Sequence, residues 1–124
     1  KNESPPAAES TMPSTMVTSG SVNIQITSID CKSKPEIVTI ENTGDSSQDL
    51  TGWKIEDDGP KYTFNFPVGF SLEPESLVKL ISGESGDNSN KTIYWKSRTV
   101  WNNDGDTASL FNSTGKLMSA MKCP

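Results

Sequence analysis

The chain has 124 residues, of which 31% are hydrophobic, and this is enough apolar material for one core but not for two. Its formal net charge of −5 would repel a phosphate backbone, which excludes general electrostatic attraction as a force that draws it to nucleic acid. No stretch approaches the roughly 18 apolar residues that span a bilayer. Histidine is absent, which excludes most catalytic triads and most zinc sites.

Residues 1–20 differ from the rest of the chain in composition. They carry three prolines and few large apolar side chains, so burial could not offset the entropy lost on ordering them. We expect a Ser/Thr/Pro-rich stalk or linker, with a remnant of an expression fusion as the alternative. The opening lacks the apolar core of a signal peptide, so the protein is either cytosolic or already processed; the stalk and the two cysteines favour a processed, extracytoplasmic protein. Residues 21–124 are then expected to form one domain.

The first strand is predicted where apolar and polar residues begin to alternate. Val22, Ile24 and Ile26 share one face, as a half-buried strand requires. Ile29 is out of step by one residue, which predicts a bulge or a strand end just before Cys31.

The remaining strands are predicted by short apolar runs that alternate with turn signals. A turn at 42–45 follows the second strand, an exposed polar loop at 82–90 follows the fifth, and a hairpin at 112–115 joins the last two. No segment has a sustained helical period, so we expect an all-β sandwich of about eight or nine short strands. After the first, the predicted strands lie at 36–42, around Trp53 and Ile55, at 62–66, 77–81, 93–95, 108–111 and 117–121.

An ordered set of motifs resembles the lamin tail domain, an immunoglobulin-like sandwich found in nuclear intermediate-filament proteins. The resemblance covers Ser21 to about Lys122 and implies an immunoglobulin-like fold. The chain is acidic and has no heptad rod, so it is more similar to the secreted or surface members from bacteria and archaea, which are often appended to nucleases or adhesion-type modules. The motifs are IVTIENTG (37–44), DLTGWKI (49–55), Tyr-x-Phe-x-Phe-Pro (62–67), a Leu-x-Pro turn (72–74) and WKSRTVWNNDGDTASLFNSTGKLMS (95–119).

The aromatic and glycine residues of these motifs are expected to serve packing and turns rather than chemistry. Gly52 lets the backbone turn so that the Trp53 indole enters the core, and Trp101 is expected to lie under a tight turn centred on Gly105. The full set of expected core and turn residues is Gly52, Trp53, Phe64, Phe66, Trp95, Trp101, Gly105 and Gly115.

The two cysteines stand near opposite ends of the strand-forming region. Cys31 follows the first predicted strand and Cys123 follows the last, so a sandwich could bring them together. We predict a structural disulfide; free buried thiols or a redox pair are the alternatives.

Two pairs of carboxylates are candidate catalytic groups, because glycoside hydrolysis needs only two carboxyl groups. These are Asp57 with Asp58 and Asp104 with Asp106, each in a glycine-containing turn. Turn formation accounts for both pairs, so no catalytic residue and no cofactor are expected.

Metal and glycan sites are also only weakly indicated. Two loops carry side-chain oxygens that could bind calcium, namely Asn102, Asn103, Asp104 and Asp106 in one and Asp87, Asn88 and Asn90 in the other. The twelve-residue calcium-loop pattern is absent, so no metal is predicted. The glycan acceptor pattern Asn-x-Ser/Thr occurs at Asn2, Asn90 and Asn112. The one loose basic cluster, Lys91, Lys96 and Arg98, is thin support for a phosphate-binding face.

The leading functional prediction is a non-catalytic, extracytoplasmic binding or structural module that contacts protein or a cell-envelope polymer. The runner-up is an accessory domain of a larger secreted enzyme, such as a nuclease. A third hypothesis, an independent hydrolase, predicts turnover that is lost on Asp104→Asn or Asp106→Asn.

Overall fold

The computed structural model describes residues 23–59, 62–101 and 105–124. The predicted stalk at 1–20 and Val22 lie outside the described residues. Within them the chain forms strands and no helix, so no helix there could cross a membrane. The strands are β1 (Ile24–Asp30), β2 (Glu36–Asn42), β3 (Gln48–Asp49), β4 (Lys54–Glu56), β5 (Thr63–Asn65), β6 (Ser71–Leu72), β7 (Leu77–Ser82), β8 (Thr92–Lys96), β9 (Thr107–Phe111) and β10 (Leu117–Lys122).

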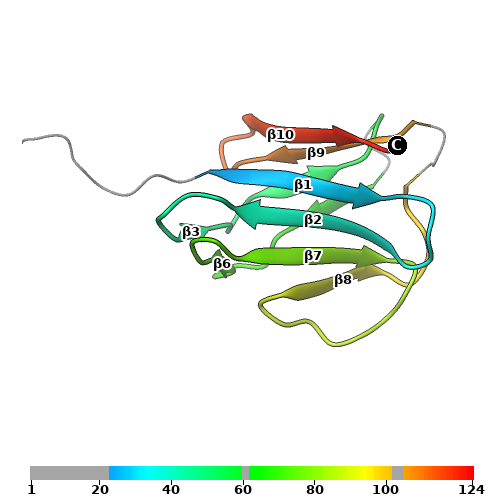
Figure 1. Cartoon of the computed structure of the whole chain (residues 1–124), viewed down its shortest axis with the longest axis horizontal. Coiled ribbons are helices and arrows are strands. Elements are labelled where there is room, and N and C mark those ends of the chain that lie inside the picture. The colour runs from blue at the N-terminus through cyan, green and yellow to red at the C-terminus, as the bar shows by residue number, and fades with distance from the viewer. Residues whose placement is uncertain (1–22, 60–61, 102–104) are drawn as a thin grey trace, which may run out of the picture.

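Two four-stranded sheets face each other across one core (Figure 1). One sheet has the order β1-β2-β7-β8 and the other β10-β9-β4-β5, while β3 and β6 form a small separate ladder. All neighbours are antiparallel except β7 and β8, which are parallel. This arrangement confirms the all-β, immunoglobulin-like sandwich.

The described strands number ten, whereas eight or nine were predicted. The additional strands are β3 and β6, which have two residues each and pair Gln48 with Leu72 and Asp49 with Ser71. A two-residue strand is too short to show alternation, so its sequence carries no period to detect.

The first strand contains the predicted irregularity. Its pairing with β2 shifts between Ile26 and Ser28, and Ile24, Ile26 and Ile29 all remain buried. An inserted residue moves the later side chains to the opposite face. The bulge therefore explains why Ile29 is out of step in the sequence and still reaches the core.

The exposed loop after the fifth predicted strand begins later than expected. Ser82 is part of β7 and only 1% exposed, and Gly83 is also buried, whereas residues 84–91 are exposed. Ser82 is polar, so the sequence pattern placed it in the loop. Its hydroxyl is buried because it donates to the Glu36 carboxylate at 3.2 Å.

The two edges of the sandwich are filled differently. On one side β1 lies beside β10, where Ile26 N–H donates to the Ser119 hydroxyl oxygen at 3.0 Å (Figure 1). Near the edge strands of the other side, β5 and β8, the contact between sheets is aromatic: the Phe64 and Trp95 ring centroids are 5.8 Å apart. One edge of the sandwich is thus closed by neighbouring strands, and the other is packed with aromatic rings.

Candidate functional site

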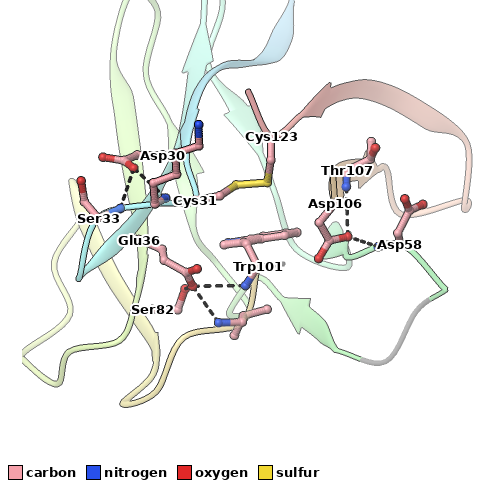
Figure 2. Close-up of a disulfide and its surroundings, with 12 residues drawn as sticks. Asp30, Cys31, Ser33, Glu36, Asp58, Ser82, Trp101, Asp106, Thr107 and Cys123 are labelled. Atoms are coloured by element: carbon pink, nitrogen blue, oxygen red, sulfur yellow. Dashed lines mark hydrogen bonds between the residues drawn. A yellow bond between two sulfur atoms is a disulfide. The ribbon is translucent and has the colours of Figure 1, made fainter. Parts of the chain in front are cut away.

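A disulfide joins Cys31 to Cys123 across 92 positions of sequence, which matches the predicted pairing (Figure 2). The two Cα atoms are 5.9 Å apart, and the residues are 4% and 5% exposed. Beside it, Cys123 N–H donates to the Asp106 carbonyl oxygen at 2.7 Å. The bond fastens the end of β1 to the residue that follows β10.

Close to this disulfide, a buried carboxylate organises the chain. Glu36 begins β2 and is only 2% exposed. Its Oε1 accepts from Val100 N–H at 2.7 Å, from Trp101 N–H at 3.2 Å and from the Ser82 hydroxyl (Figure 2). A buried carboxylate requires such donors, so Glu36 fixes the segment after β8 against β2 and β7.

Sequence analysis missed Glu36. It was assigned to a strand as one polar residue among others, and nothing local distinguishes a buried glutamate from a solvated one. The donors belong to Ser82, Val100 and Trp101, which lie 46, 64 and 65 positions further along the chain.

Most of the expected core and turn residues lie where packing or turn roles require them. Trp53, Phe64, Phe66 and Trp101 are between 4% and 8% exposed, whereas Trp95 is half-buried. The Trp95 and Trp101 ring centroids are 6.0 Å apart. Positive φ angles of 81°, 113° and 86° occur at Gly52, Gly105 and Gly115.

Each candidate carboxylate pair has one described member that accepts backbone N–H groups. The Asp57 carboxylate accepts from Tyr62 N–H at 2.9 Å, and Asp106 accepts from Asp58 N–H at 2.8 Å and from Thr107 N–H at 3.0 Å. Tertiary structure therefore brings the turn at 57–59 beside Asp106. Asp104, with Asn102 and Asn103, lies outside the described residues.

No group of three or more His, Cys, Asp or Glu side chains that could hold a metal occurs in the described ranges. In the second candidate calcium loop, Asn88 Oδ1 accepts from Tyr94 N–H at 2.8 Å. Ser89 N–H donates to the Thr92 carbonyl oxygen at 2.8 Å. These bonds cover part of the outer edge of β8 with the chain's own loop, which is a known protection against strand addition.

The glycan acceptor patterns fall in different surroundings. Asn90 is exposed in the loop before β8. Asn112 is half-buried, and its Oδ1 accepts from Thr114 N–H and Lys116 N–H, both at 3.0 Å, as a hairpin residue. Asn2 lies outside the described residues.

A sequence model of the Lamin Tail Domain family matches residues 17–123. The chain belongs to the lamin tail domain family. No curated protein matches it. Among solved structures, the chain is similar to the archaellum periplasmic stator protein FlaG from Sulfolobus acidocaldarius. The alignment covers 82% of this chain and 98% of the FlaG chain, with 16% sequence identity and a TM-score of 0.49.

The three basic residues that form a loose cluster in the sequence do not all lie together in this lamin tail domain. Lys91 precedes β8, whereas Lys96 and Arg98 lie at and beyond its end, so the strand separates them. Lys34 and Thr99, which belongs to the segment after β8, instead both lie close to Gly83. A Cβ atom at Gly83 would be 3.4 Å from Lys34 Cγ and 3.3 Å from Thr99 Cγ2.

The connection between β1 and β2 in this lamin tail domain is held by a local cap. The Asp30 Oδ1 atom accepts from Ser33 N–H and Lys32 N–H, both at 3.0 Å (Figure 2). These backbone bonds, chiefly that from Ser33, hold the Asp30 pKa below its ordinary value. At the opposite end of the sandwich, the hydroxyl and the backbone N–H of Thr51 lower the pKa of Asp49 in the same way.

Proposed function

We propose that this lamin tail domain is a non-catalytic, extracytoplasmic binding or structural module that contacts protein or a cell-envelope polymer. Membership in the family supports a structural or interaction module. The chemistry of the site agrees with this, because Asp57 and Asp106, one carboxylate from each candidate pair, accept backbone N–H groups in turns.

The observation that carries the extracytoplasmic part is the buried disulfide between Cys31 and Cys123. Disulfides persist in oxidising compartments and are reduced in most cytosols. A buried bond between the residue after the first strand and the residue after the last is therefore suited to a domain in an oxidising compartment. The division into a linker at 1–20 and a domain at 21–124 belongs to this proposal.

The compartment is tested on the protein in its own cells. Cells are quenched with acid, free thiols are alkylated, and the fraction of Cys31 and Cys123 found as one disulfide-linked peptide is measured beside the fractionation of the protein. An oxidised protein in the envelope or medium supports the proposal. A reduced protein in the cytosol contradicts it.

Binding is tested by immobilising the oxidised domain and presenting envelope and medium fractions, with duplex DNA as competitor at moderate salt. The control is an unrelated immunoglobulin-like domain of similar acidic charge. A ligand retained by this domain alone supports a binding module. If only DNA is retained, the acidic-charge argument against nucleic acid is wrong.

A further inference from the structure

One corner of the sandwich gathers cationic side chains from segments that are far apart in sequence. Lys32 and Lys34 come from the connection between β1 and β2, and Lys96 and Arg98 come from the end of β8 and the segment after it. These four residues are called the cationic corner. They meet because β1, β7 and β8 end at the same side of the sheet and β2 begins there (Figure 1).

The segments that form the cationic corner are held against one another by hydrogen bonds and packing, so they present one surface. Gly83 N–H donates to the Lys96 carbonyl oxygen at 2.9 Å, and a Cβ atom at Gly83 would lie 3.4 Å from Lys34 Cγ and 3.3 Å from Thr99 Cγ2. On the other flank, the Asp30 cap and the disulfide at Cys31 fix the loop that carries Lys32 and Lys34. A loop that is already ordered loses little entropy on binding a ligand.

Two clefts open on this surface. One of about 360 Å³ is lined by Lys32, Ser33, Lys34 and Thr99, with Glu36 and Trp101 also contributing. The other, of about 160 Å³, is lined chiefly by Glu84, Ser85, Tyr94, Trp95, Lys96 and Ser97. The first cleft offers cationic and hydroxyl groups, and the second offers the hydroxyls of Ser85 and Ser97 beside Lys96.

The positive charges of the corner are available to a ligand. Within the described ranges, Lys32, Lys34 and Arg98 form no ion pair, and Lys96 Nζ lies 5.4 Å above the Tyr62 ring. Three carboxylates lie nearby: Asp30 and Glu36 are directed at backbone N–H groups, and Glu84 is exposed. Acidic residues elsewhere are screened beyond a Debye length of about 8 Å.

We infer that the cationic corner binds an acidic glycan, with an anionic substituent between Lys32 and Lys34 and an adjoining sugar ring in the cleft of Ser85, Lys96 and Ser97. Lysine ammonium groups recognise carboxylate or phosphate, and serine hydroxyls can donate to and accept from the hydroxyl groups of a sugar ring. The inference rests on the proposed extracytoplasmic function and names the class of envelope polymer.

A glycan fits these observations better than duplex nucleic acid. DNA carries one charge per about 1.7 Å of axis and binds through many cations, whereas this chain has a net charge of −5 and one corner of four. Clefts of this size admit a sugar and its substituent rather than a duplex.

The test measures binding of the full chain to a short oligogalacturonate, its methyl-esterified neutral counterpart, a phosphorylated oligosaccharide and duplex DNA, by calorimetry at two salt concentrations. The two anionic probes separate carboxylate from phosphate as the recognised group. The variant is Lys32→Ala with Lys34→Ala, and the matched control is Lys91→Ala with Lys116→Ala, two exposed lysines outside the cationic corner. Circular dichroism melting establishes that both variants fold.

Binding of either acidic polymer, weakened roughly tenfold or more in the Lys32/Lys34 variant and unchanged in the control, supports the inference. Failure of both acidic polymers to bind overturns it, as does equal binding of the neutral ester, preference for DNA, or equal losses in the two variants. If envelope material is captured by the domain but the Lys32/Lys34 variant captures it equally well, the inference fails while the proposed function stands.

Discussion

Glu36 and Trp101 are 65 residues apart in the sequence, yet the Trp101 backbone N–H donates to the Glu36 carboxylate at 3.2 Å. The same oxygen accepts from Val100 N–H and from the Ser82 hydroxyl. This single buried side chain therefore joins β2, β7 and the segment after β8, beside the disulfide and beneath the cationic corner.

Removal of the Glu36 carboxylate should destabilise the fold strongly. Glu36→Ala leaves three buried donors without an acceptor, and we expect a loss of roughly 3 kcal/mol in the free energy of unfolding, measured by urea denaturation. Glu36→Gln keeps an acceptor and should lose about 1 kcal/mol. The exposed Glu84→Ala serves as control and should change stability by less than about 0.5 kcal/mol. Equal losses for Glu36→Ala and Glu84→Ala would refute the role assigned to Glu36.

Reduction of the disulfide should remove much of the stability. The bond closes a loop of 92 positions, and the chain-entropy model gives a contribution of about 4 to 5 kcal/mol for a loop of this length. We expect Cys31→Ala with Cys123→Ala to melt far below the oxidised protein and close to the reduced wild type. An oxidised and a reduced protein that melt at the same temperature would contradict this.

The loop before β8 should protect the edge of that strand. Asn88→Ala removes the acceptor of Tyr94 N–H, so we expect amide hydrogen exchange at Tyr94 to rise roughly tenfold while global stability changes by less than about 1 kcal/mol. Asn90→Ala, in the same loop and without a side-chain hydrogen bond among the described residues, is the control. Similar exchange rates at Tyr94 in both variants would show that Asn88 does not protect the edge.

Stability should fall on the acid side through Asp30 and Asp49. Both carboxyls have a folded-state pKa lowered from the ordinary 3.8, so their contribution is present above that pH and is lost as pH falls through the lower folded value. Asp30→Asn should therefore flatten the dependence of the unfolding free energy on pH below about 4. Asp87→Asn, a matched change of charge in the exposed loop, should leave the slope intact. If the two variants give the same slope, the Asp30 cap contributes nothing.

Gly52 should tolerate a side chain less well than Gly59. Both have positive φ, 81° and 69°, which alone disfavours alanine by about 1 kcal/mol. A Cβ atom at Gly52 would also lie 3.1 Å from Ser113 Cβ, whereas nothing lies within 4 Å at Gly59. We expect Gly52→Ala to lose about 2 kcal/mol or more and Gly59→Ala about half of that, by thermal unfolding. A larger loss for Gly59→Ala would show that the contact with Ser113 is easily relieved.

Local pattern was enough to predict the long strands. Residues 36–42 were predicted and observed with the same bounds, and the step at Ile29 was explained by a bulge. The short strands β3 and β6 were missed because two residues cannot show a period. Ser82 was assigned to the loop because it is polar, and its hydrogen bond to the distant Glu36 cannot be recognised from the local sequence.

The sequence by itself determined the fold class and the family, because alternation and motif order are properties of neighbouring residues. Only the tertiary structure decided which of the many carboxylates is buried and which lysines share a surface. Glu36 gained its donors, and Lys34 its place beside Thr99, from the order in which β1, β2, β7 and β8 join one sheet. Such contacts depend on strand topology, and nothing in the composition of the separate segments specifies them.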